Sequence, residues 1–290
     1  MDLSAFDFKA AMFDFDGTIT EPGNYEPDKA VAYRLTRLAL KMPIAFCTGR
    51  QLESFLDHGF ETLMDEIPEK FHKVVLKNLH LIAENGSIGY RFDIESNEFK
   101  EFYRVDWPEE YISRKKLMDD LNQAVSEYGA VYYRKHRIVV VMRTHDHNSG
   151  DIGLISGSSS KIYDICEKVL SNFDKNFVEH LHIGDSGIGV VICPANGDKD
   201  TGIKMFGQFL EKEYGFDLGE NSKKIMAVGD HPEKRGNDHY FLNGSCGTPF
   251  TVNIVIEGTK FPTPVYNELG ELLKGPLATV YLIDALLLMA

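Results

Sequence analysis

The sequence predicts an α/β protein that consists of a core with a mostly parallel sheet and a smaller α+β insert. Short apolar runs alternate with amphipathic segments at both ends of the chain, a pattern typical of parallel strands joined by crossover helices. Between about residue 90 and residue 193 the strands instead read as antiparallel. We therefore expect a discontinuous core at residues 1–88 and 194–290, and an insert at residues 89–193.

The first half of the core alternates strands and helices, as hydrophobic periodicity indicates. In chain order, the expected elements are a strand at residues 10–15, a helix at 28–40, a strand at 44–47, a helix at 51–60 and a strand at 79–83. Ligands of parallel sheets bind at the carboxyl ends of the strands. Asp16, Thr48 and Asn85 all follow such ends.

The insert is expected to hold two helices and a small antiparallel sheet. In chain order, these elements are a helix at residues 113–128, a strand at 131–142, a helix at 161–170 and a hairpin of residues 177–183 and 189–193. The Gly/Ser-rich stretch at residues 150–160 predicts a loop within the insert. Gly-Asp-Ser-Gly at residues 184–187 echoes a serine-hydrolase motif, but without a His/Asp partner pattern it is better interpreted as a turn.

The alternating pattern resumes after Pro194, with a helix at residues 200–214 and strands at 225–228 and 250–255. The apolar segment at residues 280–288 contains Asp284 and is shorter than the ~20 residues that span a bilayer. We expect this segment to dock as a last helix or to form a subunit contact. A homodimer through this helix or through the insert is therefore open.

The composition excludes several classes of protein. A formal net charge of −13 argues against nucleic-acid binding, which requires a basic surface. The four cysteines are scattered and form no Cys-x-x-Cys pair, so neither a zinc site nor a disulfide framework is expected. No signal peptide and no membrane-spanning segment is visible, and the cysteine usage fits a reducing compartment. We expect a cytoplasmic protein.

Asp14 and Asp16 stand two residues apart at the end of the first apolar run, and Gly17 and Thr18 follow. On a strand their side chains would point to opposite faces, but where the strand ends the backbone can turn both toward one site. Neighbouring carboxylates repel unless a cation lies between them, and Mg²⁺ is the usual solution. The segment predicts phosphoryl transfer, with one Asp as nucleophile and the other as acid/base. The alternative is an ordinary strand-ending turn.

Such a site needs a lysine and further oxygen ligands, and both follow downstream. Lys199 precedes a helix, where its charge can offset that of a phosphoryl group, although alone it would be interpreted as a surface lysine. Thr48 offers a hydroxyl donor at a strand end. The alternative is that Thr48 caps the start of the following helix. The predicted Mg²⁺ ligands are Asp14, Asp16 through its backbone carbonyl, Asp230, Asn237 and Asp238. The alternative for the last three is a polar turn.

The order of these motifs resembles that of the haloacid dehalogenase (HAD) superfamily. Residues 14–18 match its first motif, Thr48 the second, Lys199 the third, and the acidic segment at residues 230–238 the fourth. The resemblance covers most of the chain, and the position of the insert is similar to that of the type C2 cap in the Cof-like, or IIB, subgroup. It implies a Rossmann-like core beneath a cap.

The resemblance also implies a Mg²⁺-dependent phosphatase that acts on a small phosphorylated metabolite, for which we expect a sugar phosphate. Asp14 would attack phosphorus and form an aspartyl phosphate, while Asp16 would protonate the leaving oxygen and then activate water. Thr48 and Lys199 would hold the phosphoryl oxygens. The expected substrate-binding residues are Gly17, Thr18, Gly49, Arg50, Asn85, Arg134 and Arg143.

The spacing within residues 229–238 looks like the longer fourth motif of eukaryotic-type phosphomannomutases. Two features depart from those mutases: residues 21–23 are Glu-Pro-Gly where the mutases carry a basic residue, and the insert lacks their Arg-Ser-rich stretch. Arg134, Arg137 and Arg143 are candidates for holding a second phosphate, or are solvated surface residues. A hexose-phosphate mutase is therefore the first alternative. The second is a non-catalytic phosphate-binding protein, because a fold does not fix a function.

Overall fold

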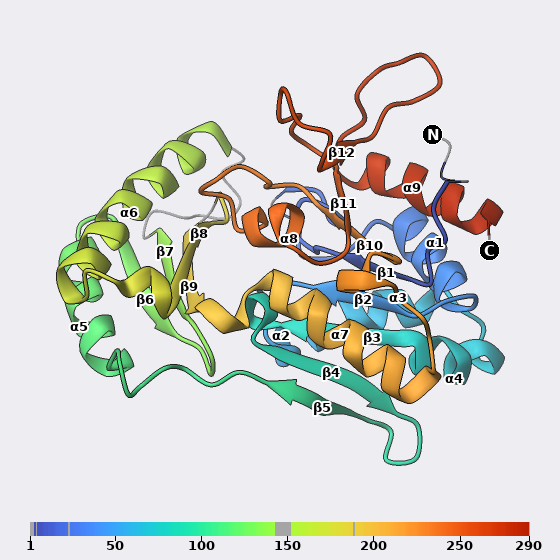
Figure 1. Cartoon of the computed structure of the whole chain (residues 1–290), viewed down its shortest axis with the longest axis horizontal. Coiled ribbons are helices and arrows are strands. Elements are labelled where there is room, and N and C mark those ends of the chain that lie inside the picture. Colours follow the sequence, from blue (N-terminus) through green and yellow to red (C-terminus); the bar gives the residue numbers. More distant parts are fainter. Residues whose placement is uncertain (1–2, 4, 23, 143–151, 188, 290) are drawn as a thin grey trace.

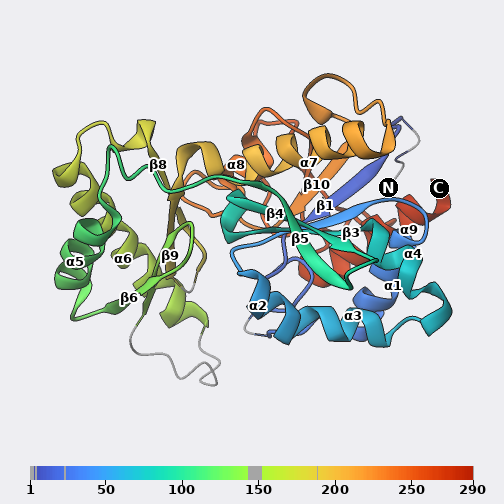
Figure 2. The same ribbon diagram turned by 90° about the horizontal axis from the view of Figure 1, so that it is seen from below.

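The chain folds into two units, a larger one around an eight-stranded sheet and a smaller one around a four-stranded sheet (Figure 1). The computed structural model describes residues 3, 5–22, 24–142, 152–187 and 189–289. Helices cover both faces of the large sheet, and the small unit stands at one end of it (Figure 2). The predicted α/β fold with a separate α+β unit is confirmed. We call the small unit the insert and the rest the core.

The large sheet has the strand order β12-β11-β10-β1-β2-β3-β4-β5 and is parallel from β12 to β3. Its strands are β1 (Ala10–Phe13), β2 (Ile44–Cys47), β3 (Leu79–Ala83), β4 (Ile88–Asp93), β5 (Glu98–Arg104), β10 (Ile225–Gly229), β11 (Thr248–Thr251) and β12 (Thr263–Pro264). The last predicted strand, at residues 250–255, is thus earlier and shorter in the structure, and β12 follows it.

Strand β1 lies inside this sheet and is buried on both faces. Ala11 and Phe13 pack in one hydrophobic cluster, whereas Ala10 and Met12 pack in a second. The two clusters lie on opposite faces because successive side chains of a strand alternate. A strand covered on both sides reads as a continuous apolar run. This is why the sequence was sufficient to locate β1.

Helices of the core fall on the two faces of the sheet (Figure 2). One face is covered by α1 (Lys29–Ala39), α2 (Leu52–Phe55), α3 (Glu61–Asp65), α4 (Glu69–Asn78) and α9 (Gly275–Met289). The other face is covered by α7 (Lys199–Tyr214) and α8 (His239–Asn243).

The helix predicted at residues 51–60 is not uniform. After α2 the chain continues as a π-helical turn at Leu56–Phe60, in which His58 leaves helical geometry with φ −134° and ψ 34°. The carbonyl of His58 accepts a hydrogen bond of 3.0 Å from the guanidinium of Arg50. The irregular turn therefore supplies a partner for a side chain near the strand ends.

The insert contains an antiparallel sheet of order β6-β7-β9-β8 with two helices against it. Its elements are β6 (Gly129–Tyr133), β7 (Ile138–Met142), β8 (Leu181–Asp185), β9 (Gly189–Pro194), α5 (Arg114–Val125) and α6 (Ile152–Phe173). Val190 and Ile192 pack toward α5 and α6. Because side chains alternate, Val191 and Cys193 of the same strand face the core.

Two predictions within the insert differ from the structure. The single strand expected at residues 131–142 is a hairpin of β6 and β7, because the polar residues 134–137 form a turn between them. Residues 152–160, which we expected to form a loop, belong to α6. Gly and Ser lower helix propensity by less than about 1 kcal/mol each, which does not exclude them from a long helix.

The sheets also place the start of the insert differently from the prediction. Strands β4 and β5 are antiparallel, as expected after residue 89, but both pair within the large sheet. Alternation of apolar and polar residues indicates an antiparallel strand without telling which sheet it joins. We therefore propose the boundary between core and insert after Arg104, the last residue of β5.

The chain passes between core and insert twice, and Ser87 contacts both passages. Its carbonyl accepts the N–H of Val105 at 2.7 Å, and its hydroxyl donates to the carbonyl of Gly197 at 3.0 Å. Ser87 is fully buried. The two connecting segments are therefore fastened side by side at one point of the core.

Helix α9 packs against α1. The prediction that the C-terminal apolar segment docks as a last helix is confirmed by the buried face of α9. Leu282 and Ile283 are fully buried, and Arg34 of α1 forms an ion pair of 2.9 Å with Asp284. Leu288 on the same helix is 90% exposed. Among the described residues, no helix has both the length and the apolar character that crossing a membrane requires.

Replacing Leu282 by alanine should lower the free energy of unfolding by about 2–5 kcal/mol, because it leaves a cavity where α9 meets the core. The matched variant Leu288→Ala on the exposed side should change it by less than about 0.5 kcal/mol. Urea unfolding measures both. An equal loss in the two variants would mean that the exposed side of α9 is also covered in solution.

Candidate active site

The polar residues meet where three neighbouring strands end. Asp14 follows β1, Thr48 follows β2 and Asp230 follows β10, and these strands are adjacent in the sheet. The N–H of Asp14 donates to the carbonyl of Val228 at 2.7 Å, which continues the pairing of β1 with β10 by one step. Parallel pairing in this register brings the carboxyl groups of Asp14 and Asp230 together.

Lys199 lies at the centre of the site with 1% of its surface exposed. Its Nζ donates to Asp14 Oδ1 at 2.6 Å and to Asp238 Oδ1 at 2.5 Å. Lys199 is the first residue of α7, and the carboxylate of Asp198 caps this helix by accepting the N–H of Thr201. The cap fixes the start of α7 and with it the position from which Lys199 reaches across the strand ends.

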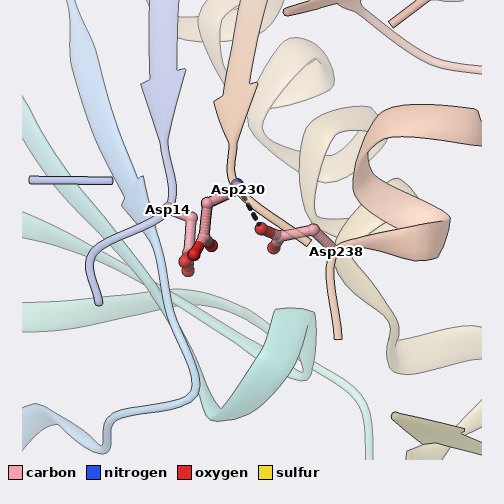
Figure 3. Close-up of side chains that lie close together, drawn as sticks. All are labelled: Asp14, Asp230 and Asp238. Atoms are coloured by element: carbon pink, nitrogen blue, oxygen red, sulfur yellow. Dashed lines mark hydrogen bonds between the residues drawn. The ribbon is translucent and has the colours of Figure 1, made fainter. Parts of the chain in front are cut away.

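Asp238 forms the opposite wall of the site. Its Oδ2 accepts the backbone N–H of Asp230 at 2.9 Å and that of His231 at 3.2 Å. Figure 3 shows the carboxylates of Asp14 and Asp230 next to each other, with Asp238 approaching from the start of α8. Asp238 therefore orders the backbone that carries Asp230.

Burial makes the charges of this cluster interdependent. Desolvation, together with the negative charge of Asp238, raises the pKa of Asp14 to about 7 despite the nearby Lys199. Desolvation also raises the pKa of Asp230 well above its usual range. Burial alone would raise the pKa of Asp238, but the charge and hydrogen bond of Lys199 lower it. The cluster therefore contains more buried carboxyl groups than the single positive charge of Lys199 can neutralise.

The three acids fit a divalent cation. Asp14, Asp230 and Asp238 each offer an oxygen within 4.8 Å of the others, and all three are buried. Asp230 Oδ1 is buried and has no hydrogen-bond partner among the described residues, as expected of an oxygen that coordinates an ion. Gly17 makes room for this carboxylate: its φ is +79°, and a Cβ there would lie 2.2 Å from Asp230 Oδ2. Asn237 Oδ1 is likewise buried without a partner.

Asp16 lies at the edge of the cluster, and its carboxylate pairs with Arg50. The guanidinium contacts the two carboxylate oxygens at 2.6 and 3.2 Å, stacks 4.3 Å from the ring centre of Phe15, and donates to the carbonyls of Tyr25 and His58. Arg50 was expected to bind substrate. In the structure these partners hold its guanidinium beside Asp16.

Thr48, Gly49 and Asn85 lie together on the other side of Lys199. The hydroxyl oxygen of Thr48 accepts the N–H of Arg50 at 3.1 Å, and this bond does not use the hydroxyl hydrogen. Asn85 adopts φ 65°, and its Oδ1 is buried without a partner. Thr18 is also buried. Its carbonyl accepts a hydrogen bond from the hydroxyl of Thr279, so Thr18 links the loop after β1 to α9.

The arginines of the insert differ sharply from one another. Arg134 donates to the carbonyl of Tyr133 and lies over the ring of Tyr132, within its own hairpin. Arg143 lies outside the described residues. Arg137 is buried, and its guanidinium lies close enough to Gly49 that a Cβ there would be 3.0 Å from Nη1. Of the two arginines that the structure describes, Arg137 is the one that lies at the strand ends.

Arg137 is also unusual in its electrostatics. Among the described residues no carboxylate forms an ion pair with its guanidinium, and its Nε has no hydrogen-bond partner. Burial lowers the pKa of this guanidinium to about 10. A buried cation without a partner is costly unless an anion accompanies it.

Two histidines of the site were not identified from the sequence. His182 of β8 contacts Asp198 at 3.0 Å and stacks on Tyr240 with ring centres 3.8 Å apart. His231 lies 3.4 Å from Asp230; burial would lower its pKa, but the hydrogen bond with Glu233 and the charge of Asp230 raise it to about 10. For His231 a signal existed, because it directly follows Asp230. For His182 none did, since its partners are distant in sequence.

The space enclosed at this site is small. A cavity of about 10 Å³ is lined by residues of both units, including Asn85, Lys199, Cys193 and Asn237. This is near the minimum volume for one water molecule. A larger hollow of about 540 Å³ lies elsewhere, between α2, α4 and the β4–β5 hairpin, and is lined mainly by apolar residues. Lys199 and Asn237 line the small cavity, whereas no residue of the cluster lines the larger hollow, so the small cavity is the one that adjoins the cluster.

No family model and no curated protein matches the chain. Solved structures do match it. The N-terminally truncated, IMP-bound IMP-nucleotidase of Plasmodium falciparum has a TM-score of 0.62 at 14% identity, over 98% of this chain and 68% of that one. The C-terminal domain of C. albicans trehalose-6-phosphate phosphatase has a TM-score of 0.63 at 13% identity, over 99% and 95% of the two chains.

The trehalose-6-phosphate phosphatase of Aspergillus fumigatus also matches, with a TM-score of 0.52 at 15% identity, over 99% and 95% of the chains. Likenesses at 13–15% identity show the fold alone. The chain therefore has the fold of these nucleotidase and phosphatase structures, and the similarity extends over both its core and its insert.

Proposed function

We propose that the chain is a Mg²⁺-dependent phosphatase that hydrolyses a small phosphorylated metabolite through an aspartyl phosphate. The observation that carries this proposal is the buried cluster in which Lys199 bridges Asp14 and Asp238 beside the unpartnered oxygen of Asp230. A carboxylate held by a lysine at a cation site is equipped to attack phosphorus, because the cations offset the charge of the phosphoryl group. The structural likeness to phosphatases of phosphorylated metabolites supports the same activity.

The reaction requires two proton transfers, both assigned to Asp16. In the first step Asp14 attacks phosphorus, the bond from phosphorus to the leaving oxygen breaks, and Asp16 gives that oxygen a proton. In the second step water attacks phosphorus, Asp16 takes a proton from it, and the bond to Asp14 breaks, which releases phosphate. Arg50 serves in this scheme to hold Asp16, consistent with its two contacts to that carboxylate.

Asp14, Asp230 and the backbone carbonyl of Asp16 would hold the Mg²⁺, with Asn237 and Asp238 behind them. When bound, the ion would offset the charge of the carboxylates and of the phosphoryl oxygens. Thr48 would donate its hydroxyl hydrogen to a phosphoryl oxygen, and Lys199 would keep Asp14 oriented. The insert would act as a cap and must open to admit a substrate, because Asp14, Lys199 and Asp230 are all buried in the docked arrangement.

The activity is tested with a panel of phosphorylated metabolites in the presence of Mg²⁺, in which released phosphate and isomerised sugar phosphate are measured together. Release of phosphate that stops with EDTA and returns with excess Mg²⁺ is the expected result. Binding of phosphate without turnover of any ester would instead favour a non-catalytic binding protein.

Asp14→Asn should abolish turnover, since the amide cannot attack phosphorus. The same change should alter the pH dependence of stability with a defined sign. The pKa of Asp14 is raised from 3.8 to about 7, so ionising this group costs the folded state stability as the pH rises through that range. Measured with EDTA, wild type should therefore lose stability relative to the variant as the pH rises from about 4 to 7, whatever the difference between them is at pH 4. Near-wild-type turnover would contradict the role of Asp14 as nucleophile.

One observation favours a second candidate, a hexose-phosphate mutase. A mutase returns the phosphoryl group to a sugar that carries a second phosphate. The buried Arg137, which forms no ion pair with the described residues, is suited to such an anion. The same arginine would equally suit a phosphatase whose substrate carries two anionic groups. The panel separates the two activities, because only the mutase yields isomerised sugar phosphate.

Arg137→Met should raise KM at least tenfold for substrates with a second anionic group and change it little for p-nitrophenyl phosphate, which lacks one. Loss of a charge-assisted contact of about 1.5–3 kcal/mol gives this magnitude. Arg134→Met is the matched control, since it removes the same charge from the same turn and should leave KM near that of wild type. Equal effects of the two substitutions would contradict a specific role of Arg137.

A further inference from the structure

The turn at residues 184–187 of the insert, which the proposed chemistry does not use, contacts the segment that carries the acids. This segment, residues 230–238, is called the acidic loop. Asp185 at the end of β8 forms a parallel bridge with Gly236 of the loop. The N–H of Asp185 donates to the carbonyl of Arg235 at 2.7 Å, and the N–H of Asn237 donates to the carbonyl of Asp185 at 3.0 Å.

These two bonds fix the backbone on either side of Gly236, immediately before Asn237 and Asp238. Backbone packing there is equally close. Gly184 lies so near the loop that a Cβ would be 2.9 Å from the Cα of Asn237. Contacts this short do not occur for real side chains, so the docked arrangement requires glycine at position 184.

The turn itself is held rigidly within the insert. The carboxylate of Asp185 accepts a hydrogen bond from Ser159 of α6 and another from the N–H of Gly187 at 2.8 Å. Ser159 is fully buried. The acidic loop is thus braced against an element that is anchored to the core of the insert.

A second contact lies farther along the loop. Arg235 forms ion pairs of 2.8 Å with Asp164 and 3.7 Å with Glu167, both on α6, and lies 4.7 Å from the ring centre of Tyr163. The neighbouring Lys234 is exposed and forms no ion pair among the residues that the structure describes. The acidic loop is therefore long enough for Arg235 to contact α6 of the insert.

We propose that residues 184–185 of the insert position Asn237 and Asp238, so that docking of the insert and binding of a divalent cation by the acidic loop favour each other. Docking orders the backbone next to Asp238, and Asp238 in turn holds the N–H groups of Asp230 and His231. Coupling of this kind is reciprocal: if docking tightens cation binding, the cation favours the docked insert by the same factor. The inference rests on the proposed function only in that the acids bind a cation.

The test uses the full chain and two measurements that need no turnover: amide hydrogen exchange of the acidic loop, and the Kd for Mn²⁺ followed by electron paramagnetic resonance. Gly184→Ala is acceptable to its own backbone, since φ at Gly184 is not positive, but it is incompatible with the docked loop. It should speed exchange of residues 231–238 and weaken Mn²⁺ binding about tenfold, within the range typical of coupled sites. Unchanged exchange together with unchanged Kd would overturn the proposal.

A charge-reversed set keeps the test decisive if Gly184→Ala does not fold. Arg235→Glu should change both measurements in the same direction as Gly184→Ala, by a smaller factor of about 2–5, as expected of an exposed ion pair. Adding Asp164→Arg should restore them, and the matched control Lys234→Glu should leave them near wild type. Equal effects of Lys234→Glu and Arg235→Glu would refute docking as the cause. A protein that binds Mn²⁺ with this pattern but hydrolyses no ester would refute the proposed function and leave the coupling standing.

Discussion

The ammonium group of Lys199, buried between Asp14 and Asp238, is the interaction on which the rest of the site depends. Removing a charge from water costs several kcal/mol, and only well-placed opposite charges offset that cost. Losing one partner of such a buried group typically costs about 3–5 kcal/mol. The start of α7, the end of β1 and the start of α8 are thus bound to a common point, which fixes the three elements relative to one another.

The parallel sheet makes this meeting possible. Phe13 is in register with Val228 of β10, so the next residue of β1 and the end of β10 bring Asp14 and Asp230 side by side. A shift of one residue would exchange the faces of every side chain in β1 and would move Asp14 away from Lys199. Register in the core and geometry in the site are therefore set by the same contacts.

The sequence was sufficient for the buried strands and insufficient for most polar partnerships. The predicted strand at residues 44–47 coincides with β2, because a strand buried on both faces is a continuous apolar run. The sheet that β4 and β5 join was not predictable, since their alternation is the same at either sheet. The pairing of Arg50 with Asp16, 34 residues away, was not predictable either. The same holds for the difference between the buried Arg137 and the more exposed Arg134. Each of these features depends on which distant segments of the chain the fold brings together.

In the docked arrangement, buried polar atoms of both signs lack partners among the residues that the structure describes. Asp230 Oδ1 and Asn85 Oδ1 require a cation or a donor, whereas Arg137 Nε requires an acceptor. A partly satisfied buried network is costly, because the low dielectric strengthens each missing interaction. A phosphorylated ligand with its cation carries both kinds of group and would satisfy these atoms together. A ligand favours the state that it binds better. An occupied site would therefore favour the docked insert more than an empty site does. Under the proposed function, the unpartnered atoms would give a physical reason for a bound ligand to hold the insert against the core.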